Sequence, residues 1–518
     1  MTSQKGWSRK YYLELEPPTE EDNRPDGQRI LEALETREEL KGYRLRMRPA
    51  ALREAYPLCR ESGWKITAVL GYDGDGFTVT RLEAGDTRKE HYALCADLGS
   101  TTMVMRLLCM NDGSVKAETS VFNPQAARGE DILTRIFYVK DRPDRLEEMR
   151  RAVTAGFAEL LEKLEKISGI PLAGCSALVV AGNTAMIHFL LGLDPFCVFQ
   201  TPYAVRTLDP GVWPASELGI GIDGFVYCFP GRANYLGGDI ISGVIAAGIA
   251  DREGISVFLD IGTNGELVIG NRDFLIAGAG AAGPALEGGV VRTGMRAEPG
   301  AVDRVEIREG EIRIHTISEE PPRGICGSGI VDLLAQLFLN GWMDFRGKLV
   351  EGASPRICRY EGEPAVEYAP GLFFCQNDID EFIKTKAAAG TMVEYMMGLL
   401  GITLEDVDRF YVAGAFGTHI SKESGIAIGL YPDMDRSRLI LPGNTSLEGA
   451  AKLLLDLSLL RKTGQILECM EYVQFGAVDD FLHLMTAAQA VPHTDFRRYP
   501  TVLQELERRG HPLGERPA

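Results

Sequence analysis

Apolar and polar positions alternate along most of the chain in patterns that predict strands followed by helices. Before His91 these elements are mixed in a short, highly charged segment, which indicates a small α+β domain. The strands predicted there are residues 11–15, 66–72 and 77–82, and the helices are 27–38 and 50–62. From Tyr92 onwards, apolar strand-like runs are followed by helical periods, and the pattern starts again near Ser256. The chain is therefore expected to have an α/β architecture after its first domain.

One kind of turn occurs twice, each time at the end of a predicted strand. The strand at 92–98 runs through Asp97 into Gly99, Ser100, Thr101 and Thr102, and the strand at 257–261 runs through Asp260 into Gly262, Thr263, Asn264 and Gly265. Backbone N–H groups and hydroxyls of such a turn can bind an anion, while the carboxylate can hold a hydrated Mg²⁺. One such turn is explained equally well as an ordinary β-turn capped by Asp. Two of them favour a duplicated fold that binds phosphate groups.

A third glycine-rich turn follows a buried strand late in the chain. Strand residues Phe410–Ala413 lead into Gly414, Ala415, Phe416 and Gly417, and a helix is predicted at 422–428. Glycines let the backbone lie against a flat ring or a phosphate, and the helix would direct its positive end at the ligand. A simple strand-to-helix corner explains the turn equally well on its own. After the two phosphate turns, it indicates the adenosine side of an ATP cleft.

The length and charge of the chain limit its architecture and its partners. At about 150 residues per domain, 518 residues predict about three domains. The expected parts are residues 1–91, 92–252, 253–490 and a polar tail at 491–518 whose last residues are loose. The 55 Lys and Arg against 73 Asp and Glu give a net charge of −18, which disfavours nucleic acid and anionic membranes as partners. The sequence has no apolar signal core and no long apolar run, so a cytoplasmic protein is expected.

The ten cysteines are scattered, and no two have the C-x-x-C spacing of common metal sites. Neither an iron–sulfur cluster nor a zinc finger is expected in this chain.

The three turns together resemble motifs of the actin, sugar-kinase and heat-shock-chaperone ATPase superfamily. Residues 92–102 match its first phosphate motif, 257–265 its second and 411–417 its adenosine motif, while 237–243 and 443–450 fit its connecting helices. The resemblance implies a duplicated ribonuclease-H-like, actin-like ATPase core that encloses ATP and Mg²⁺, preceded here by the small α+β domain.

Within that superfamily the chain looks most similar to the ATP-dependent reductive activators of corrinoid proteins. The segments that carry this resemblance are 122–125, 129–136, 181–188, 282–288 and 324–332, and residues 11–19 resemble the start of the middle region of that family. The similarity extends over about residues 8–490. It implies ATP-dependent reduction of Co(II) to Co(I) in a corrinoid protein of a methyltransferase system.

The motifs and the resemblance together indicate candidate site residues. Asp97 and Asp260 are the expected Mg²⁺-linked carboxylates, and Asp239 and Glu287 are candidates for orienting water or metal. Helix N-capping is the alternative for Asp239, and a packing salt bridge is the alternative for Glu287. The expected nucleotide contacts are Gly99, Ser100, Thr101, Thr102, Gly262, Thr263, Asn264, Gly283, Gly327, Ser328, Gly414, Ala415, Phe416 and Gly417. For Gly327 and Ser328, a tight packing turn is the alternative.

The chain departs from that family in one respect that affects its chemistry. Members usually carry an iron–sulfur domain, and the cysteines for one are absent here. A separate ferredoxin or flavoprotein is therefore expected to supply the electron. A small-molecule kinase and a chaperone-like ATPase without a redox role remain alternatives, and the sequence leaves a homodimer open.

Overall fold

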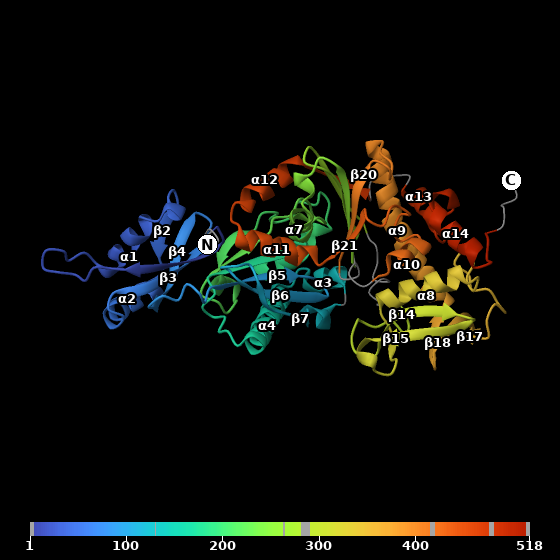
Figure 1. The fold of residues 1–518 in the computed structure, drawn as a ribbon, viewed down its shortest axis with the longest axis horizontal. Helices are drawn as coiled ribbons and strands as arrows, with labels where there is room; N and C mark the ends of the chain where they lie inside the picture. The colour runs from blue at the N-terminus through green and yellow to red at the C-terminus, as the bar shows by residue number, and fades with distance from the viewer. Residues whose placement is uncertain are drawn as a thin grey trace. The chain divides into compact units, whose positions relative to one another are not determined.

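The computed structural model describes residues 5–129, 131–262, 265–280, 291–414, 420–475 and 481–513 (Figure 1). The chain divides into two compact units. The first contains Met1–Ala246 and Thr445–Cys469, and the second contains Ala247–Asn444 and Met470–Ala518. The chain thus leaves the first unit and returns to it for one segment near its end.

The first unit begins with a four-stranded sheet of order β1-β3-β4-β2, with two helices against it. Its elements are β1 (Ser8–Glu14), α1 (Asp26–Glu35), β2 (Arg44–Met47), α2 (Pro49–Glu61), β3 (Lys65–Tyr72) and β4 (Gly76–Ala84). This is the predicted α+β arrangement with one strand more. Sequence analysis missed β2 because its four residues alternate two arginines with Leu45 and Met47, which gives no apolar run. The strand forms by parallel pairing with β4 at the edge of the sheet.

The second sheet of the first unit has six strands in the order β7-β6-β5-β8-β10-β9. Strands β7, β6 and β5 are antiparallel, whereas β5, β8 and β10 run parallel. Helix α4 packs on β7 and β6, and α11 packs on β5 and β8. The bounds are β5 (Tyr92–Leu98), β6 (Thr102–Cys109), β7 (Val115–Phe122), α3 (Ile132–Val139), α4 (Pro143–Ser168), β8 (Ala177–Gly182), α5 (Thr184–Leu191), β9 (Gly211–Pro214), α6 (Ala215–Leu218), β10 (Phe225–Cys228), α7 (Gly238–Ala247), α11 (Thr445–Leu455) and α12 (Leu459–Cys469).

The second unit repeats five strands of this topology in a six-stranded sheet of order β22-β13-β12-β11-β20-β21. Its sixth strand, β22, pairs parallel with β13, whereas β9 pairs antiparallel with β10 at the other edge of the first sheet. Strands β13, β12 and β11 are antiparallel, like β7, β6 and β5 of the first sheet. Strands β11, β20 and β21 run parallel, like β5, β8 and β10. The bounds are β11 (Ile255–Ile261), β12 (Gly265–Gly270), β13 (Leu275–Gly280), β20 (Val407–Ala413), β21 (Leu439–Gly443) and β22 (Met470–Gln474). The predicted duplication of an α/β core is confirmed.

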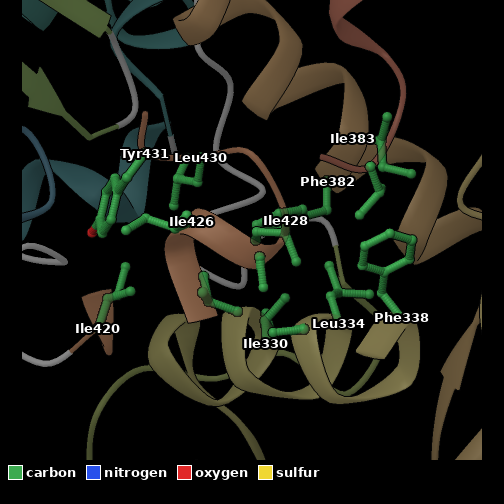
Figure 2. Packing of buried hydrophobic residues seen from close by; sticks show 14 of the residues in the cluster. Ile330, Leu334, Phe338, Phe382, Ile383, Ile420, Ile426, Ile428, Leu430 and Tyr431 are labelled. Atoms are coloured by element: carbon green, nitrogen blue, oxygen red, sulfur yellow. The ribbon is translucent and has the colours of Figure 1, made fainter. Parts of the chain in front are cut away.

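The core of the second unit also joins several helices and two three-stranded sheets. Ile330, Leu334 and Phe338 recur every fourth residue on α8, and this apolar face packs beside Ile426 and Phe382 (Figure 2). The remaining elements are β14 (Ala301–Arg308), β15 (Glu311–Thr316), β16 (Gly324–Ile325), α8 (Gly327–Leu339), β17 (Ile357–Tyr360), β18 (Glu363–Ala369), β19 (Leu372–Cys375), α9 (Gln376–Leu400), α10 (Lys422–Ala427), α13 (Phe481–Ala488) and α14 (Pro500–Arg508).

The segment predicted as a polar tail contains a helix that belongs to this core. In α14, Val502 and Leu506 are four residues apart and both are buried. Only these two residues of the helix are buried, and most of the others are polar. The segment therefore has the composition of a polar tail, although it packs as an amphipathic helix. The predicted looseness concerns the last residues, and 514–518 lie outside the described part of the chain.

Helices α7 and α11 cross at a point where a side chain would not fit. A Cβ atom at Gly449 of α11 would collide with the backbone carbonyl oxygen of Ser242 in α7. The Ser242 hydroxyl also donates a hydrogen bond of 2.6 Å to the carbonyl oxygen of Ser446. The close approach of the two helices therefore depends on the glycine.

We expect Gly449→Ala to lower the free energy of unfolding by about 1–3 kcal/mol, because a backbone carbonyl cannot rotate away from the added methyl group. The matched control is Gly464→Ala in α12, where an added Cβ has no neighbouring atom within 4 Å. That change should stabilise the protein by roughly 0.5–1 kcal/mol through better helix propensity. Thermal unfolding midpoints measure both, and a Gly449→Ala midpoint at or above that of Gly464→Ala would contradict the account.

Candidate functional site

The two duplicated sheets place a carboxylate at the same position. Asp97 is the last but one residue of β5 and lies opposite Ala181 of β8. Asp260 is the last but one residue of β11 and lies opposite Ala413 of β20. Both side chains are partly exposed. In each sheet the aspartate thus lies at the carboxyl end of a central parallel strand, which is where open α/β sheets bind ligands.

The turn after Asp97 is fastened to the protein interior through its backbone. Asn123 donates to the carbonyl oxygen of Gly99 through Nδ2 and to that of Thr101 through its backbone N–H, both at 2.9 Å. Arg135 donates to the carbonyl oxygen of Ser100 at 2.6 Å. Three successive carbonyl groups of the turn are therefore held by hydrogen bonds from two buried residues. The side chains of Ser100, Thr101 and Thr102 are partly exposed, as phosphate contacts require.

Arg135 is fully buried yet remains a cation. Its Nε also donates to the carbonyl oxygen of Gly129 at 2.8 Å, so α3 is tied to both the turn and the loop before it. Burial lowers the pKa of Arg135 to about 10, partly offset by the nearby carboxylate of Asp131. At neutral pH the guanidinium therefore keeps its proton and its hydrogen bonds.

Asp239 lies in the first turn of α7, in the same unit as Asp97. A glycine just before this turn lies close to the chain after β8: a Cβ on Gly237 would lie 2.5 Å from the Cα of Asn183. The Asp239 carboxylate accepts a hydrogen bond of 2.9 Å from the backbone N–H of Ile240. Asp239 is partly exposed and lies near the carboxyl end of β8. Asp97 lies at the carboxyl end of the neighbouring strand β5.

In the second unit, a glycine makes room for the carboxylate of Asp260. Gly414 follows β20 with a φ of +101°, and a Cβ there would lie 2.8 Å from Oδ1 of Asp260. Both the backbone conformation and this approach require glycine. Gly262 is partly exposed beyond β11. The structure therefore brings Asp260, Gly262 and Gly414 together at one sheet edge.

Six predicted nucleotide contacts and the candidate carboxylate Glu287 fall in parts of the chain that the structure does not describe. Thr263, Asn264, Gly283, Glu287, Ala415, Phe416 and Gly417 lie outside the described residues. Their roles stay predictions.

Gly327 and Ser328 form the start of α8, which packs on β14. Both residues are buried, and a Cβ on the next residue, Gly329, would collide with the carbonyl oxygen of Val302. The Ser328 hydroxyl lies 3.4 Å from the sulfur of Cys326. This geometry favours the tight packing turn, and the nucleotide role of the two residues stays a prediction.

Sequence reasoning assigned no role to four residues that surround the two aspartates. Asn123 and Arg135 hold the turn after Asp97, and the Ser446 hydroxyl donates to Asp97 Oδ1 at 2.9 Å. Glu266 of β12 lies directly opposite Asp260 and is only 7% exposed. The first three occur in segments that resemble the family, but their contacts depend on tertiary structure. Glu266 could have been found from the sequence, because an acidic residue near the start of an apolar strand is unusual.

The described ranges lack two features that would point to other functions. They contain no group of three or more His, Cys, Asp or Glu side chains placed to hold a metal ion. No helix in these ranges has the length and apolar character needed to cross a membrane.

Three family models match almost the whole chain. They describe the RACo linker region at residues 7–89, the RACo middle region at 92–252 and the C-terminal ASKHA domain of RACo at 254–503. The opening segment, which resembled the middle region, thus matches the linker model. The ASKHA match agrees with the predicted actin-like ATPase core.

The proteins similar to the chain include two curated relatives and a solved structure. The corrinoid activation enzyme RamQ of Eubacterium limosum is 29% identical over 72% of this chain and 66% of its own length. The [Co(II) methylated amine-specific corrinoid protein] reductase of Methanosarcina barkeri is 26% identical over 49% of each chain. The chain therefore spans just under two thirds of one curated relative and about half of the other.

The solved structure is a reductive activator for a corrinoid, iron–sulfur protein. It superposes with a TM-score of 0.88 at 34% identity and covers 96% of this chain and 81% of its own. The similarity includes the strands that carry Asp97 and Asp260, since it extends over nearly all residues. On these matches, the chain belongs to the RACo family of reductive activators.

Proposed function

We propose that this chain is an ATP-dependent reductive activator of a corrinoid protein. The observation that carries the proposal is its similarity, over 96% of the chain, to a solved reductive activator for a corrinoid, iron–sulfur protein. Two curated relatives named for corrinoid activation and Co(II) corrinoid reduction support it. The substrate is a corrinoid protein whose cobalt has been oxidised to Co(II).

Mg-ATP is the proposed nucleotide. Magnesium prefers oxygen ligands and keeps several waters, and Asp97 and Asp260 offer carboxylate oxygens that are partly exposed. Both residues therefore fit the ion, which when bound would neutralise phosphate charge. The backbone turns at Gly99–Thr102 and after Asp260 are the proposed phosphate contacts. Asp239 is the proposed acceptor that orients water in the first unit.

The proposed reaction transfers one electron to cobalt and is coupled to hydrolysis of ATP. Co(II) takes up an electron from an external donor to give Co(I), while ATP and water give ADP and phosphate. ATP can drive the reduction only if the nucleotide-bound activator has a different affinity for the two states of the corrinoid protein. The proposed task of the activator is thus to favour the state of its partner in which cobalt is easier to reduce.

A separate ferredoxin or flavoprotein is the proposed electron donor. Seven of the ten cysteines are buried in the protein interior. Together with the scattered cysteine spacing, this disfavours a cluster held by this chain. Free thiols and low-potential chemistry both suit a reducing compartment, which supports a cytoplasmic location.

The central assay combines the protein, Mg-ATP, titanium(III) citrate and a Co(II) corrinoid protein encoded near its gene, and follows the visible absorption of Co(I). We expect Co(I) to form with ATP and to form far more slowly with ADP or without nucleotide. Equal rates with and without ATP would contradict the proposal. ATP-dependent phosphorylation of a small molecule would favour the kinase alternative instead.

The electron source has its own test. Protein purified without oxygen should contain iron well below one atom per chain and should lack the broad visible absorption of an iron–sulfur cluster, because its cysteines lack the spacing of cluster ligands. Iron and acid-labile sulfide analyses measure this directly. Stoichiometric iron and sulfide would show that the chain holds its own electron carrier.

A further inference from the structure

We propose that Ser446 is a positioning residue for Asp97, fixing its carboxylate for the magnesium ion of Mg-ATP. The inference rests on the proposed function, because it assigns a role to a neighbour of the proposed Mg²⁺-linked aspartate. It concerns a residue 349 positions away in sequence, on a different element of the first unit.

The contact joins the end of a strand to the first turn of a helix. The Ser446 hydroxyl donates to Oδ1 of Asp97 at 2.9 Å. Ser446 is only 6% exposed, whereas Asp97 is partly open to solvent. A hydrogen bond to a charged carboxylate is stronger than one between neutral groups. The serine therefore restrains one carboxylate oxygen from the buried side of the residue.

Ser446 lies in a helix turn that several separate contacts hold in place, so the loss of one of them leaves the turn where it is. The Ser446 carbonyl oxygen accepts a 2.6 Å hydrogen bond from the Ser242 hydroxyl of α7, which is fully buried. Two residues further along α11, Glu448 pairs with Arg106 of β6 at 2.7 Å. Gly449 allows the close approach of α7 described above. The first turn of α11 is thus fixed to both α7 and the sheet.

A fixed donor matters because a metal-binding carboxylate needs one orientation. A free aspartate side chain rotates about two bonds, and each extra orientation reduces the fraction ready to bind the ion. Hydrogen-bond partners of metal-binding residues commonly change metal affinity or activity by about 10–100-fold when removed. Ser446 is such a hydrogen-bond partner of Asp97.

A purely structural role for the same bond is the competing explanation, because the bond also ties α11 to β5. Ser242 separates the two explanations. Its hydroxyl stabilises the same helix crossing by a hydrogen bond to the backbone carbonyl of Ser446. That bond does not involve the Ser446 hydroxyl, which is the donor to Asp97. Ser242→Ala should therefore weaken the crossing without removing the donor to Asp97.

The experiment measures nucleotide affinity by isothermal titration calorimetry, once with Mg-ATP and once with ATP in EDTA, together with thermal unfolding midpoints. We expect Ser446→Ala to weaken Mg-ATP binding about tenfold and to leave ATP binding in EDTA unchanged. Ser446→Thr, which keeps a hydroxyl, should restore Mg-ATP affinity to within about twofold of wild type. Ser242→Ala should lower the unfolding midpoint and keep wild-type Mg-ATP affinity.

Three results would overturn the proposal: wild-type Mg-ATP affinity in Ser446→Ala, an equal loss of affinity with and without Mg²⁺, or an equal loss in Ser242→Ala. The wild-type titration separates this proposal from the proposed function. If the wild-type chain does not bind Mg-ATP, both fail. If it binds Mg-ATP and Asp97→Ala weakens that binding while Ser446→Ala does not, only the positioning role fails.

Discussion

A carboxylate at the end of a buried central strand must be held in place and still reach solvent, and the rest of the structure follows from this constraint. Asp97 and Asp260 lie at equivalent ends of β5 and β11, where the core stops and the turn begins. Neighbouring backbone must approach closely without covering them. Glycine meets this need at Gly414, whose positive φ and nearness to Asp260 exclude other residues.

The same constraint explains why the turn after Asp97 has so many partners. A flexible turn would lose conformational entropy on binding an anion, which would weaken the binding. Buried Asn123 and Arg135 fix the turn beforehand through its backbone carbonyls. Because Arg135 remains protonated at neutral pH, this support does not depend on physiological changes in pH. The turn is thus preorganised by residues that never need to contact a ligand.

Local patterns predicted the fold well, whereas contacts between distant segments were not predictable. The repeated Asp–Gly–hydroxyl turn predicted the duplication, because turn chemistry depends on neighbouring residues. Strand β2 and helix α14 were missed because each presents few apolar residues and forms through its partner. The Ser446 contact with Asp97 was also missed, since it joins residues 349 positions apart. The sequence therefore predicted the two strand ends that carry Asp97 and Asp260. It did not predict the residues that hold Asp97 and its turn in place.

ATP turnover by Asp97→Ala and Asp260→Ala tests most directly the central claim, that both copies of the duplicated turn serve the nucleotide. Asp408→Ala is the control, because Asp408 lies at the opposite end of β20 from Gly414. The account predicts that each site variant loses about 100-fold or more of the wild-type rate, the scale of removing a group that stabilises phosphate charge, with an unchanged unfolding midpoint. The control should keep the wild-type rate. Wild-type turnover in either site variant would contradict the account.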